Sequence, residues 1–241
     1  MKKDLKLLII IRHGERTDRV GEIPQYGILN PELTQKGKTQ SFMGSEMAIE
    51  TIKKWGLGEF SPNMIQIRTS PYIRTIQTAV QILKGFNVFF KEKKNLENIL
   101  NEIYIDFDLR KRIKPNKKIK KNEFLYNNID SYINFDQELK GINYLGDKGE
   151  FPLEAESKEQ CEKRSFNYTE NFLKKIIEKN NDKKIFIIIG HRGVLKYILK
   201  KLGYNLPDKK ILDYCSQFFF DITKGLDNAT FLENLLKPKI A

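Results

Sequence analysis

The chain has very few histidines and cysteines, which are the usual protein ligands of zinc and, for cysteine, the residues that form disulfides. It contains only two histidines and two cysteines in 241 residues. Cys161 and Cys215 lie far apart in the sequence, and there is no Cys-x-x-Cys motif or paired histidine spacing. A disulfide framework and a metal site are therefore not expected. Both cysteines are expected to be buried thiols in a reducing compartment.

The sequence also lacks a long hydrophobic run. No segment approaches the roughly 20 apolar residues that a membrane helix needs. The start of the chain resembles a signal peptide, but the apolar run at 7–11 is short and has no small-residue cleavage site after it. Because this run leads straight into Arg12 and His13, it is interpreted as the first strand. We expect a cytoplasmic protein without a membrane span.

Acidic residues are in shorter supply than basic ones. The chain has 43 Lys and Arg against 31 Asp and Glu, which gives a net charge of +12. Such a balance favours acidic partners, such as phosphorylated molecules, nucleic acid or an anionic membrane surface. The excess is densest in the basic run at 110–121. This run is either a solvated segment or an aid in attracting an anionic substrate or surface.

The two histidines share the same local setting. Each stands at the end of a short apolar run and beside a glycine: residues 7–11 precede Arg12-His13-Gly14, and residues 185–189 precede Gly190-His191. Such runs are typical of buried strands in a mainly parallel sheet, and ligands bind just beyond the carboxyl ends of these strands. The sequence therefore predicts that both imidazoles meet in one crevice, against the alternative of two unrelated core histidines.

Arginines near the first histidine favour an anion as the ligand. Arg12 directly precedes this histidine and Arg16 follows it by three residues. A guanidinium group can donate two parallel hydrogen bonds to two phosphate oxygens. A neutral imidazole among such groups is a competent nucleophile toward phosphorus. Arg74 is expected in the first turn of a helix with Ser70 as N-cap and Pro71 as first residue, where anions bind. Taken alone, Arg74 fits a solvated surface residue equally well.

Four short motifs follow one another between residue 7 and about residue 200. They are Arg12-His13-Gly14-Glu15-Arg16; Leu33-Thr34-Gln35-Lys36-Gly37; Thr69-Ser70-Pro71 with Arg74 and Gln77-Thr78-Ala79; and Gly190-His191. In this order they resemble the histidine phosphatase (phosphoglycerate mutase-like) superfamily. The Glu-Arg pair of the first motif and the stretch at 97–102 are most similar to the branch that includes the ecdysteroid-phosphate phosphatases and the tyrosine-phosphatase-like domains of T-cell signalling suppressors.

The resemblance implies a role for each matching residue. His13 would be the nucleophile that becomes phosphorylated, and the phosphoryl group would be surrounded by Arg12, Arg16, Arg74 and His191. Glu102 falls where the family has its general acid, which protonates the leaving oxygen and then activates water. Glu97 and Asp106 are nearby alternatives, and Glu102 as a plain surface carboxylate is another. The acid phosphatase and phytase branch has Asp after the second histidine, where this chain has Arg192, so phytase-like chemistry is not expected.

The pattern of strand and helix signals predicts the fold class. Strands are expected at about 5–12, 64–68, 87–91, 185–190 and 216–222, and helices at about 34–54, 71–84, 157–179 and 192–203. Strands that alternate with helices predict a three-layer α/β/α domain with a mostly parallel central sheet over residues 1–241. Residues 103 to 155 are weakly periodic, and we interpret them as an inserted lid over the carboxyl edge of the sheet.

These expectations combine into one main hypothesis and two alternatives. The main hypothesis is a metal-independent phosphomonoesterase that needs no cofactor. Its substrate would be a phosphorylated small molecule or a phosphoprotein. A nucleic-acid partner is not expected, and a homodimer is one arrangement that the chain could adopt. A phosphoglycerate mutase would use the same histidine, but mutases usually have Ser and then Trp-Asn where this chain has Arg16-Thr17-Asp18. A weakly active phosphate-binding regulatory module is the second alternative.

Overall fold

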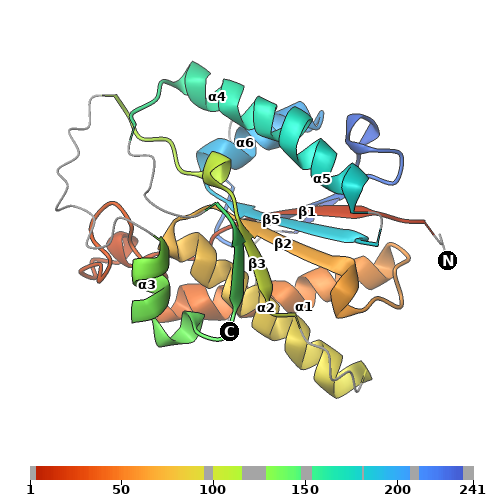
Figure 1. The fold of residues 1–241 in the computed structure, drawn as a ribbon, viewed down its shortest axis with the longest axis horizontal. Helices are drawn as coiled ribbons and strands as arrows, with labels where there is room; N and C mark the ends of the chain where they lie inside the picture. Colours follow the sequence, from red (N-terminus) through yellow and green to blue (C-terminus); the bar gives the residue numbers. More distant parts are fainter. Residues whose placement is uncertain are drawn as a thin grey trace.

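The computed structural model describes residues 4–94, 100–115, 129–147, 154–180, 182–206 and 212–235. A seven-stranded sheet lies between two layers of helices (Figure 1). Its strands are β1 (Leu7–Arg12), β2 (Ile65–Thr69), β3 (Glu102–Ile105), β4 (Asn143–Gly146), β5 (Ile185–Gly190), β6 (Gln217–Asp221) and β7 (Thr230–Leu235). The helices are α1 (Gln35–Lys54), α2 (Ile73–Lys94), α3 (Ile129–Phe135), α4 (Lys158–Asn167), α5 (Lys174–Lys179) and α6 (Arg192–Lys201).

The sheet is mostly parallel, with the strand order β4-β3-β2-β5-β1-β6-β7. The pairs from β4 to β1 are parallel, whereas β6 runs antiparallel to β1 and β7 antiparallel to β6. β1 and β5 are neighbours in register, so that Arg12 lies opposite Gly190. This confirms the predicted α/β/α fold with a mostly parallel sheet, and it places the two histidine motifs at the same edge.

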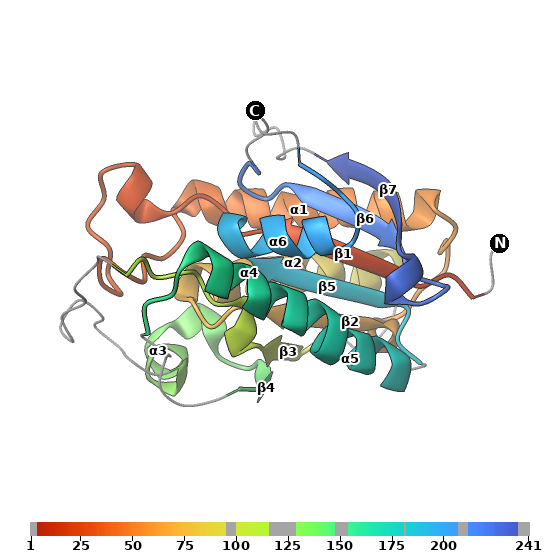
Figure 2. The same ribbon diagram turned by 90° about the horizontal axis from the view of Figure 1, so that it is seen from above.

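Alternate residues of the central strands face two separate hydrophobic cores. Ile9 and Ile187 pack against α1 and α2, whereas Ile10 and Ile188 pack against α4, α5 and α6. Figure 1 shows α1 and α2 below the sheet and α4, α5 and α6 above it, and Figure 2 shows the same layers from above. Burial on both faces explains why these strands are continuous apolar runs in the sequence.

Three expected helices are confirmed with small shifts at their ends. Those predicted at 34–54 and 192–203 are α1 and α6, and the one at 157–179 is α4 followed by a π-helical stretch, Tyr168–Leu173, and α5. Its predicted start is also confirmed, because Ser157 and Gln160 form a capping box. This arrangement satisfies orphan amide groups at the helix end.

The strand predicted at 87–91 is wrong, because these residues continue α2 to Lys94. Val88, Phe89 and Phe90 have a high strand propensity, but tertiary packing overrides it. Phe86 and Phe90 are four residues apart, are fully buried, and each meets the ring of Phe60 edge to face. The helical spacing of these aromatic rings therefore decides the local structure.

Three strands of the structure, β3, β4 and β7, were not expected, and β3 begins one residue before the segment predicted as a lid. Most of β3 and all of β4 fall within 103–155 and extend the sheet by parallel pairing. This part of the segment is therefore sheet. Residues 116–128 and 148–153, including the second half of the basic run, lie outside the described residues, and a lid formed by the remainder stays a prediction.

The two cysteines lie in the interior, as the sequence predicts. Cys161 and Cys215 are buried and unpaired, and burial raises the pKa of Cys161 to about 11 and that of Cys215 to about 12. Within the described ranges, no helix has the length and apolar character to cross a membrane.

Candidate active site

The two histidines meet where β1 and β5 end. The backbone amide of His13 donates a hydrogen bond of 3.2 Å to the carbonyl of Gly190. The ring centroids of His13 and His191 are 5.3 Å apart, and both residues are only 4% exposed. The in-register pairing of parallel strands thus brings together two motifs that are separated by more than 170 residues.

His13 is held in one tautomer and is neutral. Its Nδ1 lies 2.8 Å from the carbonyl oxygen of Gly14. Because a carbonyl only accepts, Nδ1 carries the proton and Nε2 keeps a lone pair. Burial lowers the pKa of His13 well below its ordinary value, and the charges of Arg74 and Arg12 lower it further. A neutral imidazole with a free Nε2 is suited to attack an electrophile.

His191 is held between Ser70 and Arg74. Its Nε2 lies 2.8 Å from the hydroxyl of Ser70, and its Nδ1 lies 3.3 Å from Nη2 of Arg74. A guanidinium can only donate, so Nδ1 accepts and Nε2 is the protonated nitrogen. Burial, followed by the charge of Arg74, lowers the pKa of His191 well below its ordinary value. Arg74 itself is fully buried and is therefore not the solvated surface residue that its sequence context allowed.

Ser70 is not the N-cap of α2, contrary to the sequence expectation. The helix begins at Ile73, after Pro71 and Tyr72, and the amide of Ile73 donates to Oδ1 of Asn30 at 3.0 Å. Ser70 is therefore free to contact His191. Arg74 is the second residue of α2 and stays in the first turn, where the orphan amides of a helix favour anions.

Arg12 and Arg16 complete the group of cations around the histidines. Arg12 donates to the carbonyl of Leu212, and its guanidinium carbon lies 4.1 Å from the ring centre of Tyr214. Arg16 pairs with Asp18 at 2.7 Å. The Nε atoms of both arginines are buried and have no hydrogen-bond partner. Buried donors without acceptors are rare in proteins, so these two groups favour an anion as the ligand of this site.

All five of these predicted residues line one pocket of about 190 Å³. Its described lining consists of Arg12, His13, Arg16, Arg19, Arg74, Lys111, His191, Arg192, Gly193 and Tyr214. A larger hollow of about 590 Å³ lies at the opposite edge, beside Asp221 and Lys224, but it contains no such convergence of side chains. The small pocket is therefore the candidate site. Among the residues that the structure describes, no group of three or more His, Cys, Asp or Glu is placed to hold a metal ion.

The second motif supports the loop that carries His13. A Cβ atom on Gly14 would lie 2.5 Å from the carbonyl oxygen of Gly37, and one on Gly37 would lie 2.1 Å from the carbonyl oxygen of Glu15. Thr34 caps α1 by accepting from the amide of Gly37, and its own amide donates to the Glu15 carbonyl. The two glycines therefore allow the loop to pack directly on the start of α1.

The structure does not bring Glu102 to this pocket. Glu102 is the first residue of β3 and lies opposite Asn143, whereas Ile105 at the other end of β3 pairs with Thr69. Three residues of strand put Glu102 about 10 Å behind the carboxyl edge. The expected general acid is therefore displaced along the strand, because the pairing of β3 with β2 fixes its register.

Of the two alternative carboxylates, Asp106 lies at the carboxyl edge of the sheet, where its backbone amide donates to the carbonyl of Thr69. Its carboxylate, however, is buried and accepts two hydrogen bonds from Arg68, at 2.7 and 2.6 Å, and one from Tyr168 at 2.7 Å. Burial raises the pKa of Asp106, against the effect of Arg68. Glu97 lies outside the described residues.

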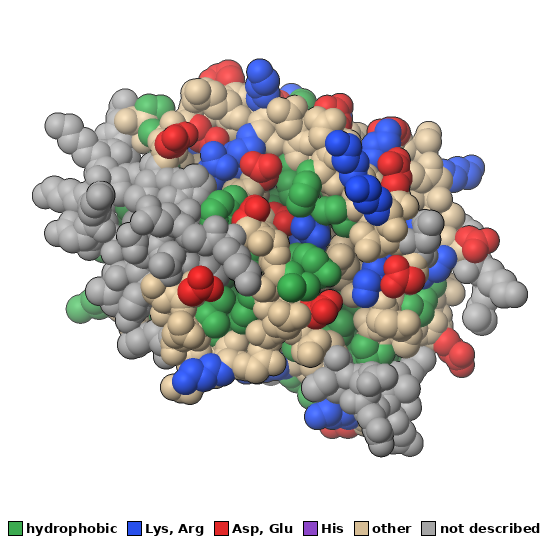
Figure 3. Space-filling view, in the orientation of Figure 1, with side chains coloured by type: hydrophobic (Ala, Val, Ile, Leu, Met, Phe, Trp, Pro, Cys, Tyr) green, Lys and Arg blue, Asp and Glu red, His purple; other side chains and the backbone are tan. Residues whose placement is uncertain are grey.

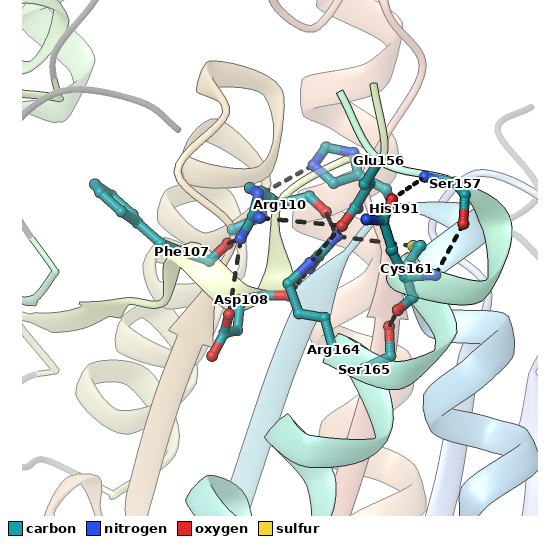
Figure 4. A network of polar contacts seen from close by, with 11 residues as sticks. Phe107, Asp108, Arg110, Glu156, Ser157, Cys161, Arg164, Ser165 and His191 are labelled. Atoms are coloured by element: carbon teal, nitrogen blue, oxygen red, sulfur yellow. Dashed lines mark hydrogen bonds and ion pairs between the residues drawn. The ribbon is translucent and has the colours of Figure 1, made fainter. Parts of the chain in front are cut away.

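A network that the sequence did not suggest holds the loop after β3 (Figure 4). Arg164 donates to Glu156 from Nε at 3.1 Å and also to the carbonyls of Asp108 and Arg110. Figure 4 shows these residues beside His191. Because Lys111 follows Arg110 directly, the network fixes the part of the loop that reaches the pocket. The pairing of Arg164 with Glu156 has a sequence separation of eight residues and gives no motif.

Comparison with known proteins supports the resemblance over the first part of the chain. Residues 8–106 match the model of the histidine phosphatase superfamily (branch 1). No curated protein matches the chain in sequence.

Solved structures share the fold over nearly the whole chain. The ecdysone phosphate phosphatase of Bombyx mori, in complex with tungstate, has a TM-score of 0.64 at 15% identity and covers 98% of this chain and 95% of its own. The phosphoserine phosphatase of Entamoeba histolytica, in complex with 3-phosphoglyceric acid, has a TM-score of 0.53 at 18% identity, with 95% of each chain covered. A mycobacterial hydrolase has a TM-score of 0.54 at 15% identity, covering 98% of this chain and all of its own. Over residues 8–106 the chain is thus similar in sequence to the histidine phosphatase superfamily, branch 1, and over nearly its whole length it shares the fold of these phosphatases.

Proposed function

We propose that this protein is a phosphomonoesterase that works through a phosphohistidine on His13. The observation that carries the proposal is the neutral imidazole of His13, with a free Nε2, in a pocket with Arg12, Arg16 and Arg74. The arginines would hold the phosphoryl oxygens, and the buried Nε donors of Arg12 and Arg16 would gain acceptors. Phosphatases with the same fold, acting on ecdysone phosphate and phosphoserine, support this class of reaction.

The reaction would take place in two displacements. In the first, Nε2 of His13 forms a bond to phosphorus while the bond from phosphorus to the leaving oxygen breaks and that oxygen takes up a proton. In the second, water attacks phosphorus, the bond to His13 breaks, and inorganic phosphate leaves. Charge on the transferred oxygens would be stabilised by the three arginines, which would supply the charge that two-metal phosphatases obtain from their ions.

The positions of Glu102 and Asp106 bear on which residue donates the proton to the leaving oxygen. Glu102 was expected in this role, but it lies behind the carboxyl edge. Asp106 is at the edge, with its carboxylate bound by Arg68 and Tyr168. Within the described part of the chain no carboxylate lines the pocket. We therefore propose Asp106, once released from Arg68, as the first candidate, before Glu102.

The proposed substrate is a phosphorylated small molecule or phosphoprotein. Mutase chemistry would require the phosphohistidine to be passed on to a second substrate hydroxyl, and a regulatory module would bind phosphate without turnover. Cytoplasmic location and a homodimer stay predictions.

One experiment tests the nucleophile and separates the alternatives. Rapid quench with a ³²P-labelled aryl phosphate should trap acid-labile, base-stable label on the wild-type chain, and His13→Ala should lose the label and at least about a thousandfold in kcat/KM. Turnover should be unchanged by EDTA. Label without phosphate release would favour a mutase, and neither label nor release would favour a regulatory module. Full activity of His13→Ala would refute the proposal.

A further inference from the structure

A short turn at residues 212–216 lies against the end of the strand that carries the nucleophile. The amide of Arg12 donates to the carbonyl of Ser216 at 3.1 Å, and the amide of Cys215 donates back to the carbonyl of Arg12, also at 3.1 Å. These bonds continue the antiparallel contact of β1 with β6 to the carboxyl edge of β1. The backbone of the turn is therefore fixed relative to the first histidine motif.

Cys215 gives this turn an unusual backbone. Its φ angle is 57°, and within the described ranges it is the sole residue other than glycine with a positive φ. Residues with a Cβ atom rarely adopt this conformation, and those that do concentrate at functional sites. The side chain of Cys215 is buried, with its Sγ 3.5 Å from Oγ of Ser41, whereas Tyr214 before it lines the pocket. The turn thus holds the tyrosine ring at the candidate site.

The ring of Tyr214 contacts both the first arginine and the nucleophile. Its centre lies 4.1 Å from the guanidinium carbon of Arg12 and 5.7 Å from the ring centroid of His13. Nη1 of Arg12 donates to the carbonyl of Leu212, whereas its Nε is buried and has no partner. A guanidinium binds an oxyanion with two donors along one edge. Because Nη1 is engaged, the edge formed by Nε and Nη2 is the one left for a phosphoryl group.

Arg12 is held without a neutralising carboxylate. On the face of the molecule shown in Figure 3, basic side chains are interspersed with acidic ones, and Arg16 and Arg68 each pair with an aspartate. Arg12 forms no such pair with any residue that the structure describes, although its burial lowers its pKa. An aromatic face attracts a guanidinium through its quadrupole and uses up none of the N–H donors. The ring of Tyr214 therefore stabilises the cation and leaves its charge for the phosphoryl oxygens.

We propose that Tyr214 is a positioning residue, whose ring holds the guanidinium of Arg12 in the plane that directs its Nε edge toward the phosphoryl group attacked by His13. This inference rests on the proposed function for its effect on catalysis. The face of the ring is the part that acts, and the hydroxyl is not required. Without the ring, Arg12 would be anchored only through Nη1, and its guanidinium would turn about that single hydrogen bond.

Replacements at position 214 separate the ring face from the hydroxyl and from the volume. Tyr214→Leu should lower kcat/KM for an aryl phosphate at least about tenfold, and Tyr214→Phe should recover at least about fivefold of that loss, because it keeps the cation–π contact. 3,4,5-Trifluorophenylalanine has the shape of phenylalanine with less negative charge on its face, and kcat/KM should be at least about threefold lower than in Tyr214→Phe. Tyr197→Leu, on α6 and outside the pocket lining, is the control and should keep wild-type kcat/KM.

The same replacement without the cation shows whether the ring acts through Arg12. In an Arg12→Gln background, Tyr214→Leu should change kcat/KM less than about twofold, because the ring then has no guanidinium to hold. An equal tenfold loss in both backgrounds would mean that Tyr214 only supports the fold, and it overturns the inference. Equal kcat/KM of Tyr214→Phe and its trifluorinated analogue overturns it as well, and this comparison stands even if Tyr214→Leu does not fold.

Tungstate binding distinguishes this inference from the proposed function. Tungstate resembles phosphate, and its Kd, measured by calorimetry, requires no turnover. This Kd should be at least about threefold higher in the trifluorinated variant than in Tyr214→Phe. Absence of phosphate release from the wild type refutes the proposed function, whereas a tungstate Kd that is independent of the ring at position 214 overturns the role of Tyr214 while phosphatase activity stands.

Discussion

The two buried histidines should make the stability of this protein fall as the pH drops below neutrality. They are the only histidines in the chain, and burial is the main cause that holds both pKa values well below 6.5. In the unfolded chain each would take up a proton near pH 6.5, whereas in the folded protein each stays neutral. The unfolded state then binds more protons, so the free energy of unfolding decreases by up to about 1.4 kcal/mol per pH unit for each histidine.

The pH-dependent loss in the free energy of unfolding is the sum of the contributions of the two histidines. Between pH 7.5 and pH 5.5 each histidine should contribute a loss of about 1.4 kcal/mol, and both together about 2.7 kcal/mol. Urea unfolding in phosphate-free buffer at the two pH values measures this change, and phosphate is left out because a ligand of the folded state would mask it.

Single variants isolate the contribution of each histidine. His13→Gln and His191→Gln should each reduce the pH-dependent loss by about half, whatever their effect on overall stability. Asp106 and Asp108 have raised pKa values and act in the opposite direction, but they are present in all three proteins and cancel in the comparison. An equal pH-dependent loss in wild type and both variants would show that the histidines do not titrate as the structure requires.

Two further predictions concern the loop around the nucleophile and the general acid. Gly14→Ala should lower kcat/KM about a hundredfold, because the new Cβ would meet the Gly37 carbonyl and the Ser41 hydroxyl at 2.5 and 2.8 Å and displace the neighbouring nucleophile. Gly58→Ala, where a Cβ meets no atom, should leave it unchanged; equal effects of the two substitutions would contradict the packing argument. Glu102→Gln should keep kcat/KM for an alkyl phosphate within about threefold, whereas loss of a general acid would cost about a hundredfold or more, and a loss of that size would return the role to Glu102.

The sequence alone was enough to predict the fold class and the meeting of His13 with His191. Both predictions depend on local patterns: a buried parallel strand must be apolar along its length, and residues that follow such strands must lie at the carboxyl edge. The glycine after His13 is also a local signal, and the structure shows the loop that carries it packed on the start of α1.

Only the tertiary structure decided which side chains surround the histidines. The register of β3 places Glu102 behind the carboxyl edge of the sheet. Elsewhere in the fold, packing against Phe60 favours a helix over a strand at residues 87–91. The amide of Ile73 at the start of α2 donates to Asn30, and Ser70 contacts His191 instead of capping the helix. The guanidinium of Arg12 lies over the ring of Tyr214. These contacts join residues 30 to 202 positions apart, and no periodicity within one segment encodes them, because strand register and side-chain pairing depend on the packing of the whole chain.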